Sequence, residues 1–244
     1  MSQNPQVTLS IVSHGQGDII RNLLEDCRSF TGASFEILLT LNMPEERGFY
    51  ADFTDLPIRV IENQKPKGFG ANHNAAFHKS HGGVFMVVNP DIRAPGLDLS
   101  HLTSVVLMPG VGACAPCVCG VDGNIEDSAR KFPTMRRLLT RVLFNRREAD
   151  YDLSCNSLVP VDWVAGMFVA FRRDVFQQVG GFDDRRFFMY LEDADICRRI
   201  NEIGNQVLVN PDVQVIHMAQ RASRRNLQHM RWHVISMMRF LSGL

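Results

Sequence analysis

The chain has 244 residues, enough for one large α/β domain, and 45% of them are hydrophobic, which excludes a disordered chain. Lys plus Arg equals Asp plus Glu at 26 each, and no nucleic-acid-binding motif appears, so we expect no nucleic-acid partner. The first residues lack a basic head followed by a long apolar run, and no apolar stretch approaches the roughly 18 residues that span a bilayer, so we expect a cytoplasmic protein.

The first half of the chain alternates strand and helix patterns. β-branched or apolar runs predict strands at 7–13, 36–41, 58–62 and within 83–91, and helical patterns fall at 19–27 and 72–79. Strands that alternate with helices in this way favour a mostly parallel sheet covered on both faces.

Polar residues stand where each of these strands ends. His14 follows the first strand, Asn42 the second, Glu62 closes the third, and Asn89 and Asp91 follow the fourth. Any one of them is an ordinary turn residue. Because ligands of open α/β sheets bind beyond the carboxyl ends of the strands, their convergence favours a polar ligand site.

The stretch "KGFGANHNAA" begins the second predicted helix. Its glycines, Gly68 and Gly70, do not make a dinucleotide-binding loop, because His73 stands where the third glycine belongs. We expect Gly68, Asn72 and Asn74 to face a phosphate or sugar. The alternative is a helix start whose Asn side chains cap the backbone.

Three cysteines in "CAPCVCG" at 114–120 lack a second cysteine pair, so small apolar residues are favoured over a zinc site. With no export signal, the six cysteines are expected to be reduced thiols.

Two basic segments predict amphipathic helices. Residues 130–147 are rich in Arg and lack acidic residues, with apolar positions recurring on one face from Met135 to Leu143. The end of the chain repeats this composition around Trp232. Such helices favour peripheral contact with the inner face of the plasma membrane. The alternative is ordinary surface helices with an apolar side in the core.

Between and beyond these segments the pattern is less regular. We expect a strand at 163–171, a short helix closed by Gly180 and Gly181, a helix at 192–204, and two short strands around a turn at 210–212.

The stretch "YLEDADICRR" crowds Glu192, Asp193 and Asp195 at a helix start. Carboxylates are favoured there by the helix dipole, and Asp195 is spaced to pair with Arg199. The functional interpretation is that one carboxylate acts as a general base, because the preceding glycines and aromatic residues indicate a shaped pocket.

His217 ends an apolar strand. Together with Asp91 and diphosphate oxygens, a neutral His217 imidazole would give a mixed oxygen and nitrogen shell that suits Mg²⁺ or Mn²⁺.

In chain order, the segments "LSIVSH", "EILLTLN", "ENQKPKGFGANHNAAF", "VVNPDI", "VAGMFVAFRRDVFQQVGGFDDRRFFMYLEDADICRR" and "VIHMAQRAS" resemble family 2 glycosyltransferases of the GT-A fold, particularly bacterial rhamnosyltransferase-like members. The resemblance covers nearly the whole chain. It implies a single GT-A domain over 1–244, a Rossmann-like mostly parallel sheet flanked by helices. Residues 1–95 would bind the nucleotide sugar, and 96–244 would supply the acceptor and catalytic half.

The resemblance also implies roles. Asp91 would hold a divalent cation, with Asn89 where the first Asp of an Asp-x-Asp motif usually stands and His217 touching metal or phosphate. Asp193 would be the base, oriented by Glu192 and Asp195. His14 and Asn42 would border the nucleoside pocket, although the base-reading Asp common near the second strand is absent.

The expected activity is metal-dependent, inverting transfer of a sugar, such as rhamnose, from a dTDP- or UDP-linked donor to a hydroxyl of a glycan or lipid-linked acceptor of the bacterial cell envelope. The alternative is a nucleotide-sugar-binding protein that has lost catalysis. A nucleotidyltransferase is disfavoured, because no Gly- and Lys/Arg-rich triphosphate loop occurs early in the chain.

Overall fold

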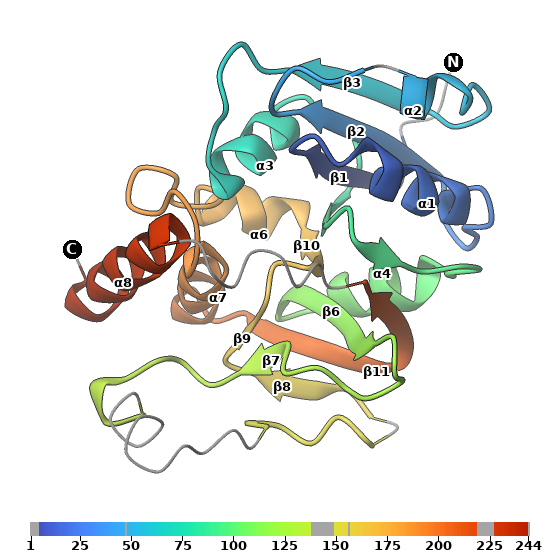
Figure 1. The fold of residues 1–244 in the computed structure, drawn as a ribbon. Helices are drawn as coiled ribbons and strands as arrows, with labels where there is room; N and C mark the ends of the chain where they lie inside the picture. The colour runs from blue at the N-terminus through green and yellow to red at the C-terminus, as the bar shows by residue number, and fades with distance from the viewer. Residues whose placement is uncertain (1–4, 47, 138–148, 156, 219–226, 244) are drawn as a thin grey trace.

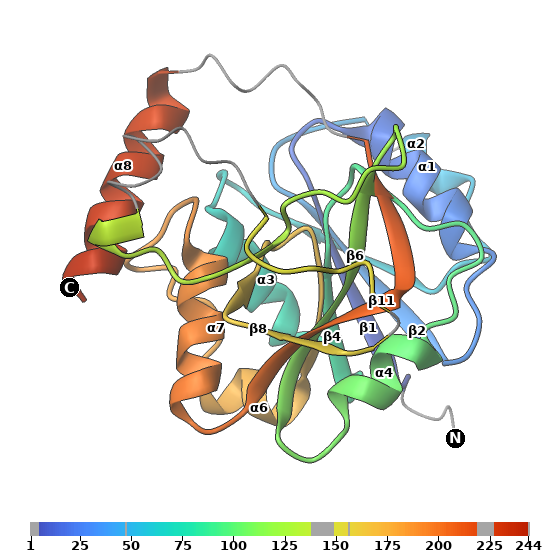
Figure 2. The ribbon, with the colours of Figure 1, turned by 90° about the horizontal axis from the view of Figure 1, so that it is seen from below.

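The structure is a computed structural model that describes residues 5–46, 48–137, 149–155, 157–218 and 227–243. A central mixed sheet runs through the molecule, and helices pack on both of its faces (Figure 1; Figure 2). This arrangement is the α/β fold, with helices on both faces of a mostly parallel sheet, that the strand and helix patterns predict.

The first four strands are parallel, as expected. β1 (Val7–Ser13) lies between β2 (Phe35–Leu41) and β4 (Val84–Val88), and β3 (Ile58–Glu62) pairs with β2 at the edge. Every residue of β1 and β4 is buried, because helices cover both faces of this part of the sheet. The carboxyl ends of these strands therefore meet at one edge.

The sheet continues with antiparallel and parallel pairs. β10 (Phe168–Arg172) is antiparallel to both β4 and β6 (Val111–Gly120), and β11 (Gln206–His217) is parallel to β6. Two short strands pair with β11, namely β5 (Ile92–Arg93) and β8 (Val159–Val161). A separate pair joins β7 (Ala129–Arg130) to β9 (Trp163–Val164).

Two apolar layers flank the sheet. One contains α1 (Gly17–Cys27) and α4 (Ser100–Val106), whose leucine, isoleucine and valine side chains are buried. The other contains α3 (Phe69–Phe77), α6 (Arg173–Gln178) and α7 (Glu192–Glu202). The short α2 (Gly48–Ala51) contacts α1, and α8 (Leu227–Ser242) lies at one end of the molecule.

Several element boundaries differ from the sequence-based expectations. The stretch 163–171 is two strands, because the backbone turns at 165–167, where the Met167 amide bonds to the carbonyl of Ala165. β11 is one strand, and the Asn-Pro-Asp turn expected at 210–212 is a register shift against β6 within it. The second helix begins at Phe69, ahead of the expected 72, because Gly68 already serves as its N-cap.

The basic segment 130–147 is not one helix. Arg130 belongs to β7, residues 131–134 lie outside helices and strands, 135–137 are helical, and 138–147 lie outside the described residues. Cys114, Cys117 and Cys119 are buried in β6 as small apolar residues. In the described part of the chain, no helix is long and apolar enough to cross a membrane.

Candidate active site

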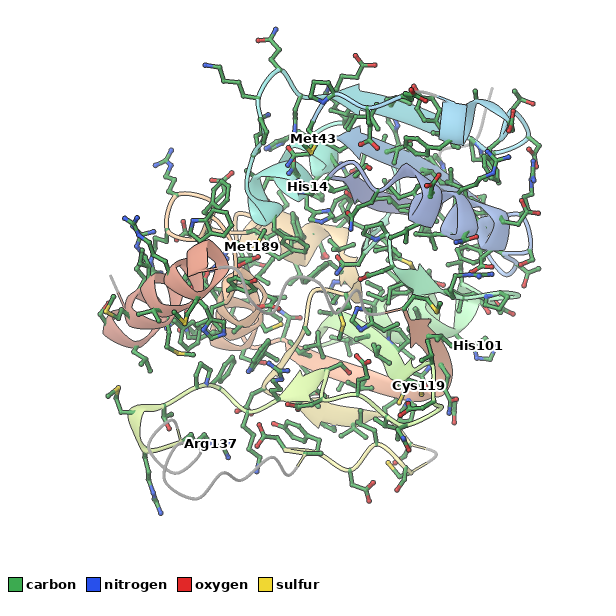
Figure 3. The ribbon with its side chains drawn as sticks, in the orientation of Figure 1. His14, Met43, His101, Cys119, Arg137 and Met189 are labelled. Carbon is green, nitrogen blue, oxygen red and sulfur yellow. The ribbon has the colours of Figure 1, made fainter. Side chains whose placement is uncertain are left out.

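A cavity of about 170 Å³ opens at the carboxyl edge of the parallel strands. His14 and Asp91 line it from the ends of β1 and β4, Phe69 and His73 from α3, and Met189 from the segment before α7. Figure 3 labels His14 and Met189, which come from distant parts of the sequence. The predicted convergence of polar strand ends on one site is therefore found for His14, Asn89 and Asp91, but not for all of the predicted residues.

Asp91 and His217 meet as predicted. Nε2 of His217 lies 3.2 Å from Oδ2 of Asp91, and the Met218 amide donates to the Asp91 carbonyl at 2.7 Å. On the other side of the ring, Nδ1 of His217 lies 2.8 Å from the Glu126 carboxylate. These two carboxylates, with Asp91 contributing most, raise the pKa of His217 to about 9. With no cation bound, these contacts favour the protonated imidazole.

The donor set fits a divalent cation in part. Oδ1 of Asp91 is buried and has no hydrogen-bond partner among the described residues, an arrangement that is costly unless a further group binds it. His217 would have to lose its proton before its nitrogen could bind a metal. In the part of the chain that the structure describes, no group of three or more His, Cys, Asp or Glu side chains is arranged to hold a metal by itself. Ligand oxygens would have to complete the coordination shell.

The turn at 165–167 connects the Asn89–Asp91 motif to Asp193. The Asn89 amide donates to the carbonyl of Met167 at 2.8 Å, while the Gly166 amide donates to Oδ2 of Asp193 at 3.1 Å. β10 begins directly after this turn and pairs with the end of β4. Two motifs about 100 residues apart in the sequence thus share one short segment of backbone.

The backbone before α7 has an unusual conformation. Tyr190 and Leu191 have φ angles of 74° and 63°, a left-handed region that side chains disfavour. Leu191 is the N-cap of α7, so these residues set the direction in which the helix begins. Strain of this kind clusters at functional sites, and here it immediately precedes Glu192 and Asp193.

Glu192 and Asp193 are adjacent carboxylates in different surroundings. Glu192 is buried, and its Oε2 has no hydrogen-bond partner among the described residues. Burial, with a smaller effect of the Asp193 charge, raises the pKa of Glu192 to about 8. Asp193 accepts hydrogen bonds from the amides of Gly166 and Ala194, yet burial still raises its pKa. Desolvation therefore outweighs the stabilising backbone contacts and makes both groups better proton acceptors.

Asp195 lies in an ion-pair network. It is fully buried and lies 2.8 Å from both Arg198 and Arg199, with Arg186 at 3.5 Å. The predicted i to i+4 pair with Arg199 is present. Arg199 also donates to the carbonyls of Val179 and Gly181, so Asp195 ties α7 to the preceding glycine turn. Its geometry is that of a residue that positions the helix.

The two histidines of the cavity are neutral. Full burial lowers the pKa of His73 to about 3, and its Nδ1 lies 2.8 Å from the Ser10 hydroxyl. Partial burial of its ring lowers the pKa of His14, against the opposing effect of Glu45. The cavity wall therefore carries uncharged imidazoles at neutral pH.

Other predicted ligand residues contact the protein itself. Asn42 is fully buried and bonds to His14, Asn63 and the backbone of Lys67. Asn72 accepts from Asn63 and donates to the carbonyl of Gly68, and no side chain caps the amides at the start of α3, so the capping alternative is not found there.

Asn74 bonds to both backbone groups of Phe182. A Cβ on Gly68 would lie 2.3 Å from the Phe188 carbonyl oxygen, so this glycine allows close packing of two segments. Glu62 is exposed at the end of β3 and does not line the cavity.

Three residues at the site were not anticipated. Glu126 is half-buried and belongs to no motif, Gly166 contributes only its amide, and Met189 lies among aromatic residues. The stretch "WVAGMF" contained one signal, a glycine within an apolar strand pattern, which often marks a bend or close approach.

Comparisons with known proteins identify the family of the chain. Residues 5–234 match the family described as Glycosyltransferase like family 2. The chain is 28% identical over 253 residues to the rhamnosyltransferase WbbL of Escherichia coli, covering 97% of this chain and 92% of that protein. It is 32% identical over 167 residues to a Mycobacterium tuberculosis N-acetylglucosaminyl-diphospho-decaprenol L-rhamnosyltransferase, covering 64% of this chain and 54% of that protein.

Solved structures show the same fold. A mannosyltransferase from Pyrobaculum calidifontis, in complex with GDP-Man and Mn²⁺, matches with a TM-score of 0.63 at 17% identity over 98% of this chain and 65% of its own. GalNAc-T7, with UDP, GalNAc and Mn²⁺, matches with a TM-score of 0.68 at 15% identity over 90% of this chain and 45% of its own. The chain belongs to the Glycosyltransferase like family 2 and is a glycosyltransferase with a GT-A fold.

Proposed function

We propose that the protein is a metal-dependent, inverting glycosyltransferase that transfers a sugar from a nucleotide-diphosphate donor to a hydroxyl of a bacterial envelope glycan or lipid-linked acceptor. Rhamnose is the first sugar to test, with dTDP or UDP as the nucleotide, because two similar proteins are named rhamnosyltransferases. The mycobacterial relative, whose name specifies a diphospho-decaprenol acceptor, supports a lipid-linked one.

The observation that carries this proposal is the shared turn at 165–167. It holds Asn89 on one side and Asp193 on the other, at 2.8 and 3.1 Å. A single displacement needs the leaving group and the base on opposite sides of the anomeric carbon, and positioning them accounts for much of catalysis. A backbone segment that bonds to both motifs supports such an arrangement.

At the donor end, Asp91 would hold the cation and His217 would contact the metal or a phosphate. A bound divalent cation supplies positive charge for the departing diphosphate. The unpartnered Oδ1 of Asp91 supports this assignment. Asn89 carries no charge, so we expect weaker metal binding than a pair of carboxylates would give.

At the acceptor end, Asp193 would take the proton of the acceptor hydroxyl. The hydroxyl oxygen would form a bond to the anomeric carbon while the bond from that carbon to the diphosphate oxygen breaks. One displacement from the opposite face inverts the configuration. Glu192, next to the base and buried, would help to set the proton affinity of Asp193.

The activity is tested by incubating the full-length protein with dTDP-rhamnose and a panel of UDP- and GDP-sugars in Mn²⁺ or Mg²⁺. Transfer to a polyprenyl-diphosphate acceptor, or slow donor hydrolysis, is the expected result. Binding of a donor without turnover under all conditions would favour the alternative of an inactive nucleotide-sugar-binding protein, in which Asn89 has replaced a needed carboxylate.

The metal assignment is tested with Asp91→Ala. Wild-type protein should bind dTDP or UDP more tightly with Mn²⁺ than without it, and the variant should lose that difference while keeping its melting temperature. Titration calorimetry measures both affinities. Equal nucleotide affinity with and without Mn²⁺ in the wild type would contradict the assignment. The matched control is Asp212→Ala, an exposed carboxylate within β11.

A further inference from the structure

The outer side of α8 carries an exposed apolar stripe. Met230, Val234 and Met238 have exposed fractions of 61%, 53% and 58%. They are spaced by four residues, which places them one above another on the same side of a helix. Exposed large apolar side chains are ordinary when isolated, but a row of them on one helix indicates an interaction surface.

Contacts on the opposite side fix the orientation of α8. The Trp232 ring packs against Phe188 with centroids 5.0 Å apart, the Ser236 hydroxyl donates to the Met189 carbonyl at 2.9 Å, and Phe240 is 5% exposed. Because this side is held against the protein, the methionine and valine side chains point away from it. The packing of α8 therefore leaves the stripe facing away from the rest of the protein.

The surroundings of the stripe are basic. No Asp or Glu occurs after Asp212, whereas Arg231 and Arg239 lie on α8 and are exposed. Met135, 61% exposed, lies beside Arg136 in the segment whose Phe132 ring packs 6.3 Å from that of Phe240. Figures 1 and 2 both place α8 and this segment at the same end of the molecule.

We propose that the α8 face, defined as Met230, Arg231, Val234 and Met238, docks on an anionic lipid bilayer. Apolar side chains between arginines suit the headgroup boundary, where the former enter the acyl region and the latter meet anionic lipid. A second copy of the chain suits this face less well. A symmetric contact would bring Arg231 and Arg239 of two helices together without an acidic residue on α8 to pair with them.

Docking would also orient the active site. The inner side of α8 holds residues 186–190, which lead directly into Glu192 and Asp193. A lipid-linked acceptor would then reach Asp193 from the membrane surface. This consequence rests on the proposed function, whereas lipid binding itself does not.

The experiment is flotation of the full-length protein with vesicles of phosphatidylcholine, with and without phosphatidylglycerol. We expect binding to the anionic vesicles at low salt, and weakening as salt screens the arginines. The triple variant Met230→Ser, Val234→Ser, Met238→Ser should bind at least about tenfold more weakly, because affinity scales with the inserted apolar area. Arg231→Gln should bind about fivefold more weakly at low salt.

The matched control removes the same number of exposed apolar side chains elsewhere, in Leu107→Ser, Met108→Ser, Val121→Ser, and should bind as wild type does. Absence of wild-type binding to anionic vesicles, or equal loss in both triple variants, would overturn the proposal. So would a concentration-dependent dimer in sedimentation velocity that the α8 triple variant abolishes. Donor hydrolysis in the absence of lipid is measured in parallel, so a failure of the glycosyltransferase proposal is distinguished from a failure of docking.

Discussion

Asp193 and its neighbours show how backbone contacts and burial set the properties of single carboxylates. Asp193 accepts two backbone hydrogen bonds, Glu192 leaves one oxygen unpartnered among the described residues, and Asp195 is surrounded by arginines. Of the three, Asp193 is the one whose carboxylate accepts from the 165–167 turn, and that turn also bonds to Asn89, which lines the cavity. We therefore assign the base to Asp193 and the positioning of α7 to Asp195.

Replacing Asp193 with Asn tests that assignment. Turnover should fall by roughly 10²- to 10⁴-fold, because a general base contributes that much to the transition state. Donor affinity should remain near the wild-type value, since the amide keeps the shape of the carboxylate. Single-turnover transfer and donor titration measure the two quantities. Glu192→Gln and Asp195→Asn are compared in parallel. If Asp193→Asn keeps a near wild-type rate while one of these two variants is inactive, the general base is the residue replaced in the inactive variant.

Glu192 should make stability depend on pH. Its pKa is raised to about 8 in the folded protein, whereas an unfolded Glu ionises near about 4.3. Between these values the folded state binds more protons, so the free energy of unfolding falls as pH rises, by up to about 1.4 kcal/mol per pH unit. The contribution of Glu192 to the free energy of unfolding is fully present below about pH 4 and is lost as pH rises past about 8.

Urea unfolding of wild type and Glu192→Gln across this range measures the effect. The variant should show a flatter dependence on pH, because Gln does not ionise. Glu202→Gln, on an exposed carboxylate of the same helix, is the control. Identical pH slopes for wild type and Glu192→Gln would contradict the prediction.

At the scale of elements, α8 and the loop before α7 depend on each other. Besides the Phe188 and Trp232 pair, Tyr190 packs 5.2 Å from His233, and the side chains of Arg186 and Arg239 each donate to the other's carbonyl. These contacts hold the loop in which Tyr190 and Leu191 adopt positive φ. The C-terminal helix thus supports the conformation that starts α7.

Trp232→Ala should weaken that support. An aromatic pair contributes about 0.5–1.5 kcal/mol, so turnover should fall by up to about tenfold if the loop must be ordered for reaction. Donor affinity should change less, because Asp91 and His217 lie on other elements. The measurement is the single-turnover rate beside the donor dissociation constant. Met238→Ala, on the outer side of the same helix, should leave both unchanged, and an unchanged rate in Trp232→Ala would show that the loop orders without α8.

At the scale of the whole molecule, an aromatic cluster joins the helices to the sheet and to the site. Phe176 of α6 is 1% exposed, and its ring lies 4.6 to 5.6 Å from those of Phe77, Phe85, Phe171 and Phe182. Phe182 in turn packs against Phe69, which lines the cavity. The core and the cavity wall are therefore continuous.

Phe176→Ala should lower the free energy of unfolding by about 3–5 kcal/mol, because it removes a large buried side chain and leaves a cavity that neighbouring rings cannot fill. Chemical denaturation measures the change. Phe188→Ala, at a ring that is 44% exposed, is the comparison and should cost much less. A loss below about 1 kcal/mol for Phe176→Ala would show that the cluster repacks.

The sequence by itself determined the elements whose patterns are local. The apolar runs at β1, β2 and β4 each bury nearly a whole strand, and the edge strand β3 buries Ile61, so the local pattern alone identified these strands and the polar residues at their ends. The likeness of the "ED" stretch to a glycosyltransferase motif was also visible without coordinates. A local sequence pattern is enough to identify an element when consecutive residues of that element are buried together.

Only the tertiary structure decided which polar side chains are available to bind a ligand and which are hydrogen-bonded to other parts of the protein. Asn42 and Asn72 look like ligand residues in sequence, but hydrogen bonds from distant segments occupy their amides. Glu126 has no motif and Gly166 contributes only a backbone amide, yet the packing of distant segments brings them to His217 and Asp193. Such contacts join residues far apart in the chain, and the desolvation that raises the pKa values of Glu192 and Asp193 exists only after these segments have packed.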